Sequence, residues 1–336
     1  MLVCRHVAFG LLLVAAQLSG QSTLRILQPS ETINVDSPSA LMVQPLRCDQ
    51  NNNIYARLVR ATAMKSPITK ISADGKSVRE FSAEGVPGLK NPATLDFAID
   101  RYGHLFMLVE GPDFKILEFD QDGKHKDTIT IDFKLIPQQL AVFGTGDFAL
   151  FGTERPLGSK RQASAAPYAG LFDRSGRFLR KIELVEKEDP DQQKALAKIG
   201  IGRTDQLSIS VAESGADGNV YLARPTSSGP VYVVSPSGVA RKVVRPAGPK
   251  NAVLSSIKLL PSGRLAALFV PMEPDNQRQV DGISLVILDP SSGDVLSEYG
   301  LDNQTGIALA CYDSSGFSFL RSGPENRLQI VRATSR

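Results

Sequence analysis

The sequence predicts an all-β fold in which four-stranded antiparallel sheets repeat around a ring. Short apolar strands alternate with tight turns rich in Gly, Asp and Asn, a pattern typical of antiparallel hairpins. The alternation recurs at a spacing of roughly fifty residues, which is the size of one such sheet. It is clearest at residues 95–129. Because each sheet has an apolar face that only a neighbouring sheet can cover, the ring must close, as in a β-propeller.

We predict six such units, or blades, within a single domain at residues 21–336. The last unit is one strand short, and the isolated strand at Thr23–Ile26 would complete it, so that the N-terminal strand closes the last blade. We interpret Pro29–Gln44 as a loop-like link. Seven blades is the alternative, if this link contains a degenerate unit. The recognisable segments of the six units start at Leu46, Leu95, Leu140, Ala216, Ile257 and Ile307.

Glycine at the turns has a physical reason. A tight hairpin needs a positive φ at a central residue, which Gly, Asn and Asp adopt most easily. The segments Asp217–Leu222, Phe119–Gly123 and Phe172–Gly176 resemble the repeats of six-bladed propellers of the NHL-repeat kind, over nearly the whole mature chain. This resemblance implies a fold and no activity, because propellers host many unrelated functions. The chain contains no Trp, so it departs from the Trp-Asp repeat family and from the Trp-motif quinoprotein dehydrogenases.

Residues 1–20 have the pattern of a cleaved secretory signal peptide. Arg5 gives a basic start, and the apolar run Val7–Ala16 is followed by small residues. The run is too short to span a bilayer comfortably, which takes about 20 residues; a buried N-terminal helix is the alternative. Gln21 stands where a bacterial lipoprotein would carry its cysteine. We therefore expect a released protein that is secreted or periplasmic.

One segment departs from the strand pattern. Residues 186–200 have acidic residues and Pro190 early, lysines late and Gly200 at the end, which is the polarity of a short helix. We predict a helical insert, either a solvated decoration or a lid over one face.

The composition excludes some functions and leaves others open. Charged residues make up 22% of the chain and are dispersed, with a net charge of +3, so we expect no nucleic-acid partner. No later run is long enough to be a transmembrane segment. We expect a monomer and no cofactor, with a Ca²⁺ ion held by carboxylates in the channel as the open alternative.

Catalytic motifs are scarce. After signal removal the histidines are His104 and His125, and we place both in hairpin turns of the second unit, away from the channel. This disfavours zinc catalysis. The chain has no Gly-x-Ser-x-Gly motif and no phosphate-binding loop.

The register of the inner strands predicts the channel wall. Glu213 and Lys258 fall in neighbouring units, so we expect them to pair near the axis, either as a structural ion pair or in a catalytic role. Cys48 and Cys311 fall in the first and last units, where a disulfide could join the ends of the ring. The residues that we place two positions before the inner turns are Cys48, Ala98, Ala141, Glu213, Lys258 and Cys311.

A set of arginines lies where the second strands of the units end or just beyond. These ends lead into the loops that share one face with the links between blades. Together they could form a cationic mouth for an anion, because Arg binds carboxylates and phosphates in a forked geometry; scattered surface arginines are the alternative. The set is Arg57, Arg155, Arg224 and Arg321.

These observations favour a binding module over an enzyme. We expect the loop-bearing face to bind an unknown protein or an anionic small-molecule or glycan ligand, with the site around units three to six, opposite residues 95–129. The alternative is a propeller lyase or hydrolase with a carboxylate or metal site in the central channel. A third interpretation is a structural subunit of an envelope assembly.

Overall fold

The structure is a computed structural model. It describes residues 25–37, 39–59, 65–132, 135–154, 167–184, 211–224, 230–244, 246, 248–249, 252–260, 262–271, 282–301, 305–306, 308–313 and 316–335. The predicted signal peptide, the predicted helical insert at 186–200 and Arg155 lie outside these residues.

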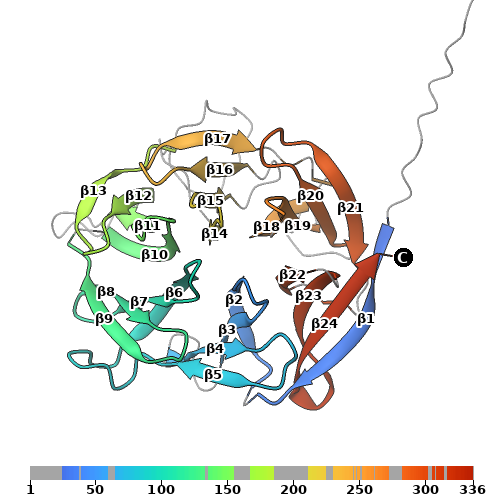
Figure 1. The fold of residues 1–336 in the computed structure, drawn as a ribbon, viewed down its shortest axis with the longest axis horizontal. Helices are drawn as coiled ribbons and strands as arrows, with labels where there is room; N and C mark the ends of the chain where they lie inside the picture. Colours follow the sequence, from blue (N-terminus) through green and yellow to red (C-terminus); the bar gives the residue numbers. More distant parts are fainter. Residues whose placement is uncertain are drawn as a thin grey trace, which may run out of the picture.

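Four-stranded antiparallel sheets surround a central axis in a propeller arrangement (Figure 1). In each sheet the first strand lies nearest the axis and the fourth lies at the rim. The first sheet consists of β2 (Met42–Cys48), β3 (Ile54–Leu58), β4 (Ile68–Ile71) and β5 (Val78–Phe81). The second consists of β6 (Ala93–Ile99), β7 (Leu105–Glu110), β8 (Phe114–Phe119) and β9 (His125–Thr130). The third and fourth sheets consist of β10 (Leu135–Val142), β11 (Phe148–Glu154), β12 (Pro167–Phe172) and β13 (Phe178–Lys181), and of β14 (Val211–Ser214), β15 (Val220–Ala223), β16 (Val231–Val234) and β17 (Ala240–Val244).

The remaining strands form one eight-stranded sheet. One half is β18 (Ala252–Leu259), β19 (Leu265–Pro271), β20 (Ser284–Leu288) and β21 (Val295–Leu301), and the other half is β22 (Ala308–Asp313), β23 (Gly316–Ser322), β24 (Leu328–Ser335) and β1 (Arg25–Val35). Each half is antiparallel. The halves are joined by parallel pairing of β1 with β21, in the register Arg25↔Tyr299, Ile26↔Gly300 and Leu27↔Leu301.

The N-terminal strand completes the last antiparallel group, as predicted. Strand β1 pairs antiparallel with β24 from Leu27 to Val35. The interpretation of residues 29–44 as a loop-like link is wrong at both ends, because β1 continues to Val35 and β2 begins at Met42. Pro29 suggested a loop, but it lies at a register shift in β1, where a missing N–H donor is tolerated.

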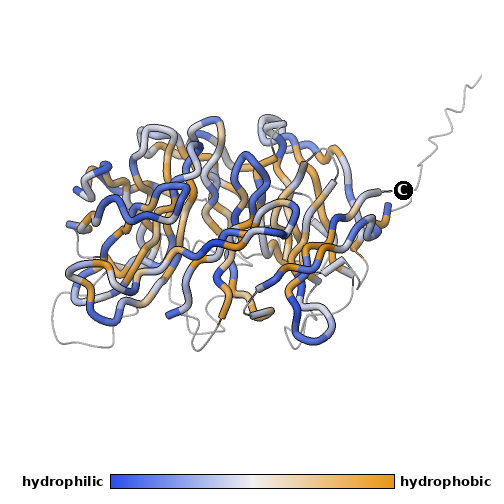
Figure 2. Tube along the Cα trace, turned by 60° about the horizontal axis from the view of Figure 1, so that its bottom comes forward, coloured by the Kyte–Doolittle hydropathy of each residue, from blue (hydrophilic) through white to orange (hydrophobic). Residues whose placement is uncertain are grey.

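The core lies between neighbouring sheets. The middle strands β3 and β7 are almost entirely buried, because other sheets cover both of their faces. Aromatic contacts join adjacent sheets, such as the T-shaped pair Phe81–Phe119, whose ring centroids lie 5.9 Å apart. In Figure 2 the strands contain most of the hydrophobic colour, and the hydrophilic segments gather at the turns. This packing is the apolar coverage that makes a closed ring necessary.

A repeated aspartate organises many of the turns. Asp100 Oδ1 accepts hydrogen bonds from the backbone N–H groups of Tyr102 (2.8 Å) and His104 (2.9 Å). Gly103, the fourth residue of this turn, has φ +79°, which explains why glycine is needed there. Asp120 and Asp173 accept the equivalent pairs of backbone bonds. The Asp-x-x-Gly motifs of the sequence are therefore turns in which a carboxylate caps the backbone.

These capped turns predict a loss of stability in acid. The backbone N–H of Lys124 holds the pKa of Asp120 below its usual value, and the Ser175 hydroxyl does the same for the pKa of Asp173. A carboxylate with a lowered pKa in the folded state stabilises the fold above its unfolded pKa of about 3.9, and this contribution is lost as the pH falls through the folded-state value. The melting temperature should therefore decrease below about pH 4. It should decrease less in Asp120→Asn, and an unchanged melting temperature down to about pH 2.5 would contradict this explanation.

Candidate functional site

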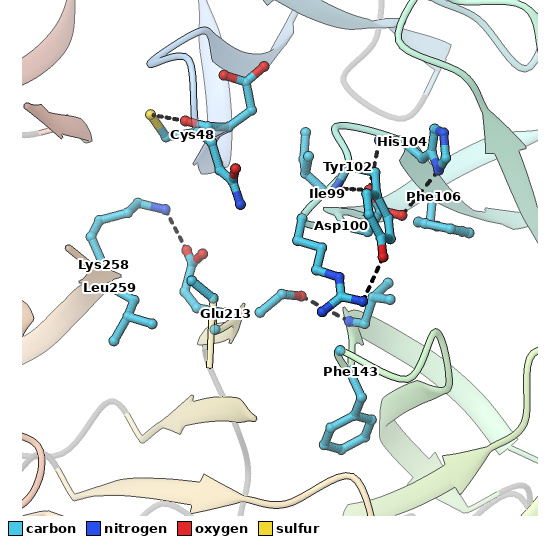
Figure 3. Close-up of a pocket in the computed structure, with 18 of the residues that line it drawn as sticks. Cys48, Ile99, Asp100, Tyr102, His104, Phe106, Phe143, Glu213, Lys258 and Leu259 are labelled. Atoms are coloured by element: carbon cyan, nitrogen blue, oxygen red, sulfur yellow. Dashed lines mark hydrogen bonds and ion pairs between the residues drawn. The ribbon is translucent and has the colours of Figure 1, made fainter. Parts of the chain in front are cut away.

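A cavity of about 650 Å³ opens at the face that carries the turns between first and second strands (Figure 3). We call it the upper cavity. Its wall includes the turn residues Asp49, Asp100 and Tyr102, and its lining extends inward to Glu213 and Lys258. Each inner turn follows a strand nearest the axis, so the ring brings these turns together around one opening.

Four buried charged side chains fill the channel below this cavity. Arg47 lies 3.2 Å from Glu213 (Nη1 to Oε2) and 3.6 Å from Asp96 (Nη2 to Oδ2). Lys258 forms an ion pair with the other oxygen of Glu213 (Figure 3). As whole residues, all four are less than 10% exposed. We call Arg47, Asp96, Glu213 and Lys258 the channel cluster, and it confirms the predicted pairing of Glu213 with Lys258.

The channel cluster also bonds the backbone of the inner strands. Arg47 donates from Nε to Phe97 O and from Nη1 to Ala212 O, both at 2.6 Å. Asp96 Oδ2 accepts from the backbone N–H of Leu140 at 2.8 Å, and Lys258 donates to the carbonyl of Leu46. The cluster thus ties β2, β6, β10, β14 and β18 together at the axis.

A second, smaller cavity of about 190 Å³ opens at the other end of the channel. Glu213 and Lys258 line both cavities, so the channel cluster stands between them. The upper cavity is therefore closed at its inner end by charged side chains, and we call this end its floor.

Burial opposes the charged forms of two members of the channel cluster. It raises the pKa of Asp96, and the nearby Arg47 counteracts this effect. It lowers the pKa of Lys258, and Glu213 counteracts this effect. Each charge therefore depends on its partners, which is the usual situation of a buried ion pair.

Sequence reasoning missed Arg47 and Asp96. The first inner turn starts at Asp49, whose N–H bonds to Asn53 O, so Arg47 stands two positions before the turn and Cys48 only one. The sequence-based prediction thus placed the start of this turn one residue too late. Asn52 at the fourth turn position, with φ 60°, could have signalled the correct start. Asp96 follows a register shift after Thr94, and a single acid within an apolar run was its only sign.

Cys48 and Cys311 form a disulfide with a Cα–Cα distance of 5.5 Å. It joins β2 to β22, the inner strands of the first and last groups. The sequence placed both cysteines two positions before an inner turn, but Cys48 lies only one residue before its turn, which starts at Asp49. Both cysteines line the upper cavity.

The arginines of the predicted cationic mouth lie elsewhere. Arg57 and Arg224 are 5% exposed, and Arg57 donates to Leu95 O at 2.8 Å. Arg321 donates from Nε to Gln329 Oε1 at 3.0 Å. Two of them are therefore buried where the sequence suggested an open mouth, and none of these three lines the upper cavity. Burial lowers the pKa of Arg57, an effect that Asp96 counteracts.

The predicted place of His104 is wrong. His104 lines the upper cavity, because its turn follows the innermost strand β6. Its Nδ1 lies 3.1 Å from Asp100 Oδ2, in the role that Asn53 plays beside Asp49 in the first inner turn. In Figure 3 the imidazole lies on the far side of Asp100 from Glu213 and Lys258. His125 lies away from the channel, as predicted, because it begins the rim strand β9. Since His104 lines the cavity, part of the segment 95–129 belongs to the site, although we expected this segment to lie opposite it.

Two further properties concern only the part of the chain that the structure describes. No group of three or more His, Cys, Asp or Glu side chains is placed there to hold a metal ion. No helix there has the length and apolar character that crossing a membrane requires.

Comparison with known proteins supports the fold. No family model and no curated protein sequence matches the chain. Among solved structures, a gluconolactonase from Xanthomonas campestris aligns with a TM-score of 0.50 at 10% identity, over 92% of this chain and 100% of that one. A PQQ-bound aldose sugar dehydrogenase from Streptomyces coelicolor aligns with a TM-score of 0.48 at 10% identity, over 92% and 98%. YCF48 bound to D1 peptide aligns with a TM-score of 0.46 at 12% identity, over 92% and 98%. The alignment with the gluconolactonase supports the β-propeller fold, and at 10% identity the similarity extends to the fold alone.

Proposed function

We propose that this chain is a secreted or periplasmic six-bladed β-propeller that binds a ligand in the upper cavity. Six blades follow if the eight-stranded sheet is counted as two, since its antiparallel halves are joined by only three parallel residue pairs. The signal-like N-terminus and the Cys48–Cys311 disulfide support an oxidising compartment.

The observation that carries the proposal is the shape and size of the upper cavity. Its volume of about 650 Å³ lies within the range of about 300–1,000 Å³ that is typical of small-molecule sites. It is closed below by the channel cluster, so a ligand would meet a defined floor. We therefore propose that the binding site lies at the face with the inner turns, and not at the loop-bearing face that the sequence predicted.

The channel cluster is better suited to holding a structure than to transferring protons. Glu213 is bound by both Arg47 and Lys258, so both of its carboxylate oxygens are engaged in buried ion pairs. Because neither oxygen is left without a partner, this arrangement favours a binding role over a catalytic role for Glu213.

The alternative is a lyase or hydrolase that uses the same cavity. It is favoured by one observation, the contact of His104 with Asp100 at the cavity wall. A carboxylate that orients an imidazole in this way is a common arrangement for a general base. In that case a bound molecule would be converted, and conversion would be lost in His104→Gln.

Tyr102 offers the sharpest test of ligand binding. Tyr102 is 57% exposed at the cavity mouth, so removal of its side chain should leave the core intact. In a thermal-shift screen of small molecules and peptides against residues 21–336, ligands that stabilise the protein should bind at least about tenfold more weakly to Tyr102→Ala.

Leu179→Ala is the matched control, because Leu179 is 42% exposed on the rim strand β13. Ligands whose affinity is equal in both variants and the wild type would place the site outside the upper cavity. Recovery of the bound molecule unchanged would support binding, and recovery of a product would support the alternative.

A further inference from the structure

We infer that the upper cavity selects ligands that carry a carboxylate, which its wall and floor bind through Arg101 and Lys258. This inference rests on the proposed function and names the chemical class of its ligand. The acidic groups of the cavity are already hydrogen-bonded within the protein, whereas two of its basic groups retain hydrogen-bond donors for a ligand.

The acidic groups of the cavity are already occupied by the protein. Asp49 Oδ1 accepts from the N–H groups of Asn51 (2.9 Å) and Asn53 (3.0 Å), and its Oδ2 accepts from Asn53 Nδ2 (2.8 Å) and the Tyr55 hydroxyl (3.1 Å). Asp100 is occupied in the same way by its own turn. These carboxylates therefore shape the turns and have little capacity left for a donor on a ligand.

Glu213, the acid at the cavity floor, is occupied as well. One of its oxygens pairs with Lys258 and the other lies 3.2 Å from Arg47. A ligand ammonium would have to displace one of these buried cations, which is costly. The floor thus disfavours cationic ligands.

The basic groups retain donors. Lys258 has three N–H donors. It uses two of them on Leu46 O and Glu213 Oε1, which leaves one without an acceptor among the described residues. In Figure 3 its ammonium points toward the open centre of the cavity. A ligand carboxylate that reaches the floor would accept this remaining hydrogen.

Arg101 is the second donor group, at the cavity wall. Its guanidinium lies over the ring of Tyr102, 4.8 Å from the centroid, and Nη2 donates to the Tyr102 hydroxyl at 2.6 Å. Within the described part of the chain it has no acidic partner, although a guanidinium has five donors. The contact with Tyr102 orients the guanidinium without neutralising its charge. A guanidinium held in this way is suited to binding a carboxylate.

The experiment compares matched probes that differ in charge. Binding of D-glucuronate and D-glucose, and of N-acetylglycine and N-acetylglycinamide, is measured by NMR titration against residues 21–336. The acid of each pair should bind at least about tenfold more tightly than its neutral partner, and this preference should weaken with added salt. Arg101→Gln should reduce the affinity for the acids at least about fivefold and leave the neutral probes unchanged.

Arg264→Gln is the control for charge alone. Arg264 is an exposed arginine in an inner turn on the same face, and it does not line the cavity. Equal effects of Arg101→Gln and Arg264→Gln would overturn the inference, and so would the absence of binding by all four probes. Neutral probes that bind as tightly as the acids, with affinity lost in Tyr102→Ala, would overturn the selection of carboxylates while the proposed binding function stands.

Discussion

Replacing Arg47 with methionine should lower the free energy of unfolding by about 3–5 kcal/mol, the usual cost of removing one partner from a buried ion pair. The substitution leaves Asp96 with a buried charge and takes one cation from Glu213. It also leaves the carbonyls of Phe97 and Ala212 without their side-chain donor. Urea denaturation at neutral pH measures the change.

Arg79→Met is the matched control. Arg79 pairs with Asp122 at 2.5 Å, but its side chain is 46% exposed, and exposed pairs contribute less than about 1 kcal/mol. A loss for Arg47→Met that is no larger than the loss for Arg79→Met would contradict the role given to the channel cluster.

Removing the disulfide is the second large effect. The double substitution Cys48→Ala and Cys311→Ala should lower the free energy of unfolding by about 4 kcal/mol, because the bond closes a very long loop in the unfolded chain. The two cysteines are separated by 263 residues. Thermal unfolding with and without a reductant measures the effect.

The double variant provides its own control. A reductant should destabilise the wild type to about the level of the double variant and leave the double variant unchanged. If the wild type unfolds at the same temperature in both conditions, the bond contributes nothing to the closure of the ring.

Much of the fold could be predicted because its signals are local. The turn at Asp217–Asn219 and the apolar strands around it depend on the preferences of a few neighbouring residues. The completion of the last sheet by the N-terminal strand was predictable as well, because the final unit ended one strand short. The extent of that strand was not, since Pro29 breaks the local pattern while the exposed edge of β24 still pairs with β1.

The site was less predictable, because it depends on register and on radial position. The first inner turn starts one residue earlier than predicted. The prediction therefore placed Cys48 at the channel wall, where the structure has Arg47. His104 and His125 both lie close to turns of one sheet, but His104 follows the strand nearest the axis and His125 begins the strand at the rim. Arg57 ends its strand as predicted, yet it is buried by neighbours that are distant in sequence.

The two ends of the channel differ in the cavities that they hold. The loop-bearing end holds buried arginines and a small cavity, whereas the end with the inner turns holds a cavity of ligand size. The segment 95–129, where the repeat is clearest, contributes Asp100, Arg101, Tyr102 and His104 to that cavity. The best-preserved repeat of the sequence is therefore also part of the proposed site.

The most direct test is a crystal structure of residues 21–336 soaked with D-glucuronate. We expect electron density for the sugar in the upper cavity, with its carboxylate within hydrogen-bond distance of Arg101 or Lys258. Density at the opposite end of the channel, beside Arg57 or Gln139, with the upper cavity holding only water, would contradict this expectation.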